Sequence, residues 1–182
     1  MNQKTTYSVL IMTRAAAIAA LYVALTYVSF FFGLSSGPVQ FRLSEALTVL
    51  PILLPESVPG LVLGCVLSNL LTGSHIIDII FGTLATLLGA LGTRALRHLK
   101  HFPPFLYTLP SILSNGIIVP LVLTFTIYGE FSHAVFWPFV GSVTLGEACV
   151  CLIFGTLLYY ELKRHGKKLF PDIRAEGRRE KE

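Results

Sequence analysis

The sequence predicts an all-α integral membrane protein, a bundle of six transmembrane helices with both termini in the cytoplasm. Of the 182 residues, 53% are hydrophobic and only 13% are charged, about half the charged share of soluble domains. Long runs lack Lys, Arg, Asp and Glu altogether, at 15–41, 57–77, 79–93 and 102–128. A soluble protein of this length has no core large enough to bury several such runs, and each approaches or exceeds the length of a membrane helix.

Proline, glycine and charge clusters divide the chain into six apolar segments. The predicted spans are Met12–Phe32, Leu43–Leu54, Val58–Thr72, Ile77–Leu96, Phe105–Tyr128 and Ala134–Leu162. Spans two and three are short, because about twelve helical residues cover only about 18 Å of a 30 Å core. They either tilt and pack inside the bundle or form one re-entrant hairpin, and six separate spans are preferred. The predicted domains are therefore an N-terminus at 1–11, a membrane domain at 12–162 and a basic tail at 163–182.

The distribution of basic residues predicts the orientation. Six spans place both termini on one side, together with thirteen of the fourteen Lys and Arg residues. The positive-inside rule makes that side cytoplasmic and the protein a multi-pass component of the cell membrane. Membrane topology therefore accounts for the net positive charge of the chain. A nucleic-acid partner is not needed to explain it and is not expected. The fourteenth basic residue, Arg42, lies on the outside in GPVQFRLSEALTVLP (37–51), and topology does not account for it.

No motif in the sequence predicts catalysis or a metal site. Walker A and HExxH patterns are missing, so the chain is expected to be a non-enzymatic protein without its own ATPase. The three cysteines, Cys65, Cys149 and Cys151, lie in apolar segments and are expected to behave as small buried hydrophobes. No cofactor is expected.

Polar residues within or at the ends of the apolar spans are the candidate ligand contacts. A charged side chain at the bilayer centre costs about 2.5–3.5 kcal/mol on insertion scales, so such residues usually face a cavity or a partner. Together they describe a pocket open to the outside. The candidates are Gln40, Arg42, Glu45, Asn69, Asp78, Asn115 and Glu147.

Each of these candidates also has a purely structural interpretation. Glu147 and Asn115 are also suited to interhelical hydrogen bonds, and Asp78 to the positive end of a helix dipole. Arg42 and Glu45 are three residues apart and suit a mutual ion pair, which is worth little at a surface. As a set, however, carboxylates accept paired N–H groups and arginine donates to a ring carbonyl. The chemistry favours a small heterocycle as ligand.

Two rows of small residues occupy the first span. One row is Ala16, Ala20 and Ala24, and the neighbouring row is Ala15 and Ala19. Small residues at this spacing let helices approach closely in lipid. The rows serve either packing within the bundle or docking of a separate membrane subunit, and the pattern alone does not separate these uses.

The segments GPVQFRLSEALTVLPILLPESVPGLVLGCVLSNLL and DIIFGTLATLLGALGTRALR resemble the QueT family of queuosine-precursor transporters. Members are classed as substrate-binding S components of energy-coupling factor (ECF) transporters. The resemblance covers about residues 12–160 and is most specific at 37–51. It implies six membrane helices and an outer pocket covered by a loop, here about Gly33 to Phe41.

The resemblance also implies partners and a ligand. The first helix would dock on an ECF transmembrane T subunit through Ala16, Ala20 and Ala24, and two ATPase subunits would drive uptake. The implied ligand is a 7-deazaguanine such as preQ1, whose aminomethyl cation suits a second carboxylate. The alternatives are an S component for another vitamin such as riboflavin, or a stand-alone proton-coupled carrier.

Overall fold

The computed structural model describes residues 3–34, 40–99 and 102–169, and all regular structure within them is helical. Its elements are α1 (Gln3–Phe31), η1 (Leu43–Ile52), α2 (Ser57–Leu71), α3 (Ile76–Ala95), η2 (Leu96–His98), η3 (Pro104–Thr108), α4 (Leu109–Tyr128), α5 (His133–Val150), η4 (Cys151–Gly155) and α6 (Thr156–Leu169). The helical fold class is confirmed. Most of the predicted lid over the pocket and the basic tail beyond Leu169 lie outside the described residues.

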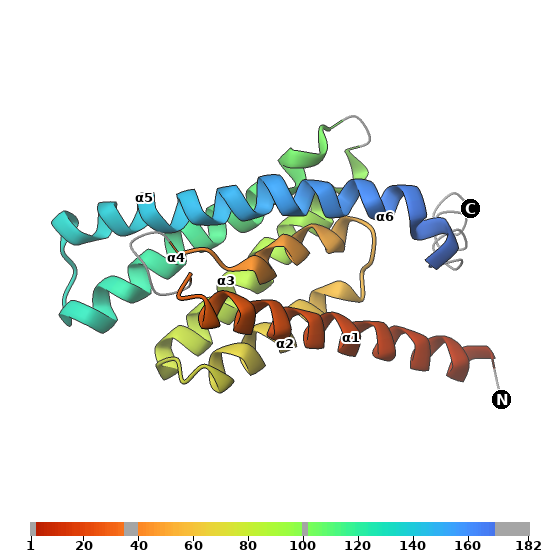
Figure 1. Cartoon of the computed structure of the whole chain (residues 1–182), viewed down its shortest axis with the longest axis horizontal. Coiled ribbons are helices and arrows are strands. Elements are labelled where there is room, and N and C mark those ends of the chain that lie inside the picture. Colours follow the sequence, from red (N-terminus) through yellow and green to blue (C-terminus); the bar gives the residue numbers. More distant parts are fainter. Residues whose placement is uncertain (1–2, 35–39, 100–101, 170–182) are drawn as a thin grey trace.

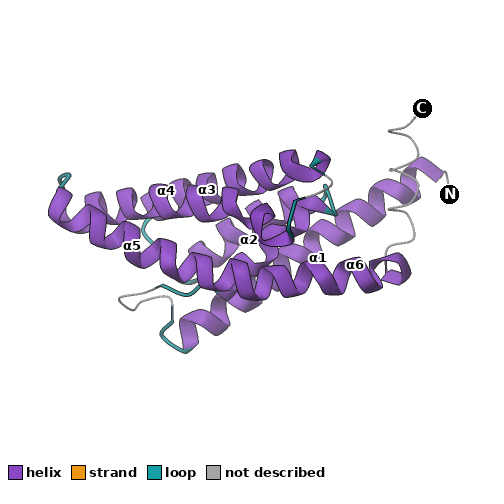
Figure 2. Ribbon diagram, turned by 90° about the horizontal axis from the view of Figure 1, so that it is seen from above, coloured by secondary structure: helices purple, strands orange, loops and turns teal. Residues whose placement is uncertain are grey.

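The long helical segments run in alternating directions along one bundle, with α5, η4 and α6 following one another in a single direction, so the start of α1 and the end of α6 lie at the same end (Figure 1). Figure 2 shows the same arrangement from above. Four helical segments are long and apolar enough to cross a membrane: Tyr7–Phe31, Ile76–His98, Pro104–Tyr128 and His133–Gly166. The helices η1 and α2 are apolar but shorter, as the sequence led us to expect.

The short second segment, η1, lies inside the bundle. Residues 44–51 are all buried, and Figure 1 shows η1 between α1 and the α5–α6 helix. It is a 3₁₀ helix, which rises about 2.0 Å per residue and so covers about 20 Å in ten residues, where an α-helix covers about 15 Å. The larger rise per residue and the position inside the bundle explain in large part how so short a segment fits among helices long enough to cross a membrane.

Helices α1 and α2 meet at two glycines. A Cβ atom at Gly60 would lie 2.7 Å from the carbonyl oxygen of Ala15, and one at Gly64 would lie 2.7 Å from Cβ of Tyr22. Side chains at either position would force the helices apart, so this four-residue spacing of glycines sets the approach. The contact fixes which face of α1 points inward.

Two arginines hold the turn between η1 and α2. Arg14 forms a partly buried ion pair with Glu56 at 3.1 Å, and Nη1 of Arg94 donates to the carbonyl oxygen of Pro51 at 3.3 Å. Both arginines belong to the predicted cytoplasmic set. The turn therefore reaches the level of the basic end of the bundle.

The last long helix is continuous from α5 through η4 to α6 (Figure 1). The η4 segment is a π-helical turn, a feature often found at functional sites. A Cβ atom at Gly155 would lie 3.4 Å from the carbonyl oxygen of Ala46. The π turn thus packs directly against the backbone of η1.

Candidate binding pocket

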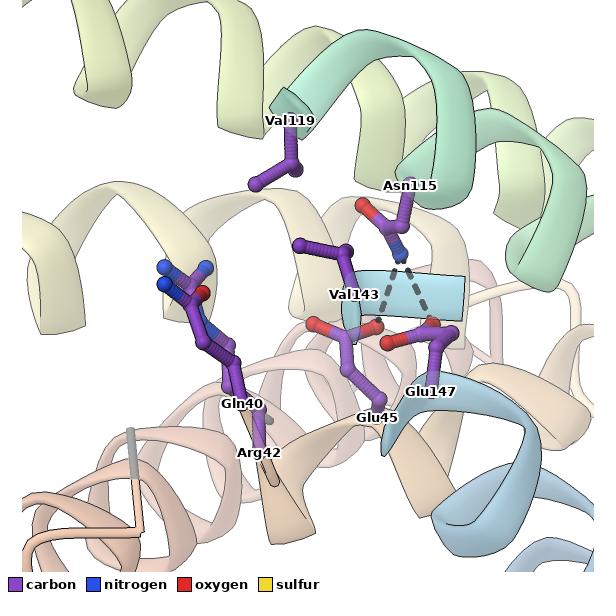
Figure 3. A pocket seen from close by; sticks show the side chains of 7 residues that line it. All are labelled: Gln40, Arg42, Glu45, Asn115, Val119, Val143 and Glu147. Atoms are coloured by element: carbon purple, nitrogen blue, oxygen red, sulfur yellow. Dashed lines mark hydrogen bonds between the residues drawn. The ribbon is translucent and has the colours of Figure 1, made fainter. Parts of the chain in front are cut away.

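A polar pocket lies in the interior of the bundle, between η1, α4 and α5 (Figure 3). Five of its seven lining residues are among the predicted candidates, and the other two are valines. The lining residues are Gln40, Arg42, Glu45, Asn115, Val119, Val143 and Glu147. The structure thus brings together side chains from three separate predicted spans.

Local backbone structure positions each polar group. Arg42 precedes η1 in extended conformation, with φ −104° and ψ 99°, and Glu45 follows in the first turn. Asn115 projects from α4 beside Gly116, where a Cβ atom would collide with Thr144 of α5. Because residue 116 has no side chain, α5 approaches closely enough for Glu147 to meet Asn115.

One amide joins the two buried carboxylates. Nδ2 of Asn115 donates to Oε1 of Glu147 at 2.8 Å and to Oε2 of Glu45 at 3.4 Å (Figure 3). The three side chains are only 2–5% exposed. Both glutamates act as hydrogen-bond acceptors toward this one amide.

Further polar groups surround the two carboxylates. The hydroxyl of Tyr22 donates a hydrogen bond to Oε1 of Glu45. The Cys151 thiol lies 3.7 Å from Oε1 of Glu147 and 3.5 Å from the backbone oxygen of Glu45. Thr48 donates to that same backbone oxygen at 2.6 Å. The first turn of η1 is therefore fixed from both α1 and the π turn.

Arg42 makes no ion pair with any described carboxylate within 4 Å. The expected partner, Glu45, turns instead to Tyr22 and Asn115. The simple ion-pair interpretation is therefore wrong, because Arg42 precedes η1 in extended conformation and does not share its helical face.

The pocket is narrow as it stands. Its cavity volume is about 10 Å³, room for about one water molecule. Gln40 and Arg42 are half-buried, and their side chains lie together opposite Asn115 and the two carboxylates (Figure 3). A ligand larger than a water molecule therefore requires side chains of the pocket wall to move.

The other two candidates, Asn69 and Asp78, are not among the lining residues. Asn69 is buried in α2 and donates to Sγ of Cys65 at 3.5 Å. Asp78 lies in the first turn of α3, where a carboxylate faces the positive end of the helix dipole. A ligand contact at either residue stays a prediction.

The two alanine rows of α1 face opposite ways. Ala15 and Ala19 are buried against the glycines of α2, whereas Ala16, Ala20 and Ala24 are all exposed. Packing within the bundle therefore uses the first row and leaves the second without a neighbour in this chain.

Sequence reasoning missed Tyr22, Thr48 and Cys151. A signal for Tyr22 exists, because Tyr22, Thr26 and Ser29 recur at helical spacing in an otherwise apolar span. All three bond to η1 or its entry: Thr26 donates to Ser44 at 2.9 Å, and Ser29 accepts from the backbone N–H of Leu43 at 2.9 Å. Cys151 had no comparable signal, since a cysteine in an apolar segment reads as core.

Comparison with known proteins gives two matches. The family model described as QueT transporter matches residues 12–164. A curated protein of Lactococcus lactis subsp. cremoris (strain MG1363), named Queuosine precursor transporter QueT, is 36% identical over 87 residues. That alignment covers 48% of this chain and about half (49%) of the relative. No solved structure gives a significant match.

Proposed function

This chain belongs to the QueT transporter family, and from that premise we propose that it is the substrate-binding S component of an ECF transporter. Its ligand is a queuosine precursor, a 7-deazaguanine such as preQ1, captured from outside the cell. The observation that carries the proposal is the pocket, where the Arg42 guanidinium has no ion-pair partner among the described residues and faces an amide-bridged pair of carboxylates.

The pocket chemistry suits a deazaguanine. The Arg42 guanidinium can donate to the ring carbonyl, and acceptors on Asn115 and Glu147 can take N–H groups of the ligand. Val119 and Val143 supply apolar surface for the flat ring. A ligand site usually combines apolar walls with a few placed polar groups, as here.

The proposed membrane arrangement has six passes with both termini in the cytoplasm. Its support is the common end shared by the start of α1 and the end of α6 (Figure 1) and the contact of Arg14 and Arg94 with the η1–α2 turn. If the basic end is cytoplasmic, Arg42, at the opposite end of η1, lies toward the outside.

The proposed partners are a transmembrane T subunit and two ATPase subunits. The exposed row of Ala16, Ala20 and Ala24 on α1 supports a docking face, since small residues permit close approach of another membrane helix. The same helix bonds to η1 through Tyr22 and Thr26. Docking and ligand binding would thus act on opposite faces of one helix.

A thermal-shift titration of the purified protein in detergent tests the ligand. A ligand that binds the folded state raises the unfolding temperature with concentration. We expect this for 7-aminomethyl-7-deazaguanine and not for riboflavin. A shift with riboflavin alone would favour the vitamin alternative, and pH-driven uptake into vesicles without partner subunits would favour a proton-coupled carrier.

A further inference from the structure

We infer that the two carboxylates of the pocket have different tasks: Glu147 contacts a cationic group of the ligand, and Glu45 is a positioning residue held by Tyr22. This inference rests on the proposed function and assigns roles within the same site. It follows from which hydrogen-bonding positions are already occupied.

Each carboxylate oxygen of Glu45 already accepts a hydrogen bond from a side chain of this protein. Its Oε1 accepts from Tyr22 and its Oε2 accepts from Asn115. The residue is 2% exposed, and Tyr22 is 1% exposed. Glu45 lines the pocket, but both of its oxygens already hold neighbouring side chains, and one of these is the amide of Asn115.

Glu147 keeps one oxygen available. Its Oε1 accepts from Asn115 and lies near the Cys151 thiol, whereas its Oε2 accepts no hydrogen bond within the described part of the chain. Both N–H groups of Asn115 serve the carboxylates, so its carbonyl oxygen points away from them (Figure 3). Two acceptors, one anionic and one neutral, thus remain for donors of the ligand.

The charge of the pocket selects the ligand class. The side chains of two glutamates and one arginine line it, and a bound cation favours the ionised form of both glutamates because it supplies the second positive charge. Unpaired buried charge is unfavourable. A ligand with one positive charge balances the second carboxylate, and a primary ammonium can donate to Glu147 Oε2 and Asn115 Oδ1 together. The site therefore prefers a monocation to a neutral molecule of the same shape.

Two analogues test the preference: 7-aminomethyl-7-deazaguanine, a cation at neutral pH, and 7-cyano-7-deazaguanine, which is neutral. Binding is measured by calorimetry on the purified wild-type chain. We expect the cation to bind about 10- to 100-fold more tightly, the range for a hydrogen bond to a charged group. Equal affinities would overturn the inference and leave the proposed function standing, whereas binding of neither analogue would overturn both.

Variants separate the two roles. Glu147→Gln should reduce the preference for the cation about tenfold or more, while the matched control Glu161→Gln, on exposed α6, should keep it. Tyr22→Phe should weaken the binding of both analogues by the same factor, because it removes a hydrogen bond that positions Glu45 without changing the charge of the pocket. The assignment of roles would be contradicted if Glu147→Gln kept the full preference for the cationic analogue. It would also be contradicted if Tyr22→Phe weakened binding of the cationic analogue alone.

Glu147→Asp covers the case in which the glutamine variant does not fold. It keeps the charge but withdraws the carboxylate by one methylene from the pocket. The preference for the cation should then fall in part, and an unchanged preference would count against a direct contact.

Discussion

Glu45 and Glu147 accept hydrogen bonds from the same amide nitrogen, that of Asn115, at 3.4 and 2.8 Å. The two glutamates come from η1 and α5, far apart in the sequence. Two like charges in a buried site need such a shared donor, because unpaired buried charges are strongly unfavourable. The amide of α4 therefore links the three elements that form the pocket.

Replacing Asn115 should damage both stability and binding. Asn115→Leu keeps the approximate volume but leaves two buried carboxylates without their donor, a loss of about 1–3 kcal/mol or more in the free energy of unfolding. Thermal unfolding in detergent measures the first effect and ligand calorimetry the second. An unfolding temperature equal to that of the wild type would show that the hydrogen bonds from Asn115 to the two glutamates do not stabilise the fold.

Arg42 should matter more for the ligand than for the fold. Its side chain has no ion-pair partner among the described residues, so Arg42→Ala should lower the unfolding temperature of the ligand-free protein less than Asn115→Leu does, although it removes the positive charge that faces Glu45 and Glu147. Affinity for the deazaguanine should fall about tenfold or more, as expected for loss of a charged hydrogen bond. Arg42→Lys should recover only part of the affinity, since the ammonium lacks the planar fork. Full affinity in the alanine variant would remove Arg42 from the site.

The packing of α1 on α2 should control the pocket through Tyr22. Gly64→Ala places a Cβ atom 2.7 Å from Cβ of Tyr22, which has no freedom to swing away. We expect a loss of about 1–3 kcal/mol in stability and weaker ligand binding. Gly141→Ala is the matched control, because a Cβ atom there meets nothing within 4 Å and alanine favours the helix. Equal behaviour of the two variants would contradict the packing argument.

The two alanine rows of α1 should respond differently to leucine. Ala16→Leu with Ala20→Leu alters the exposed row, so folding and ligand binding should persist while copurification with the T subunit falls. Ala15→Leu with Ala19→Leu alters the buried row and should cost about 1–3 kcal/mol per overpacked site. Normal copurification of the first double variant would remove the docking face.

Hydropathy and charge predicted the helical class and the approximate positions of the four long apolar helices, because membrane helices require long uncharged runs. They did not predict that η1 is a 3₁₀ helix, since its hydrophobic content is the same in either helix type. They also did not separate the alanine rows, because the face that packs inward depends on Gly60 and Gly64 of another helix.

The sequence predicted most of the polar residues that line the pocket, but not how their side chains are arranged. Five candidates line the pocket, because polar groups in apolar spans are rare and gather where they satisfy each other. The role of Arg42 depended on the backbone before η1, and that of Tyr22 on contact between α1 and η1. Neither relation is local in sequence, so spacing alone left both the ion pair and the ligand contact open for Arg42.

A structure of the protein with 7-aminomethyl-7-deazaguanine bound tests the central claim most directly. The account predicts the ligand between η1, α4 and α5, with its ammonium within hydrogen-bond distance of Oε2 of Glu147 and its ring carbonyl facing Arg42. A ligand held instead between α2 and α3, beside Asn69 and Asp78, would contradict it.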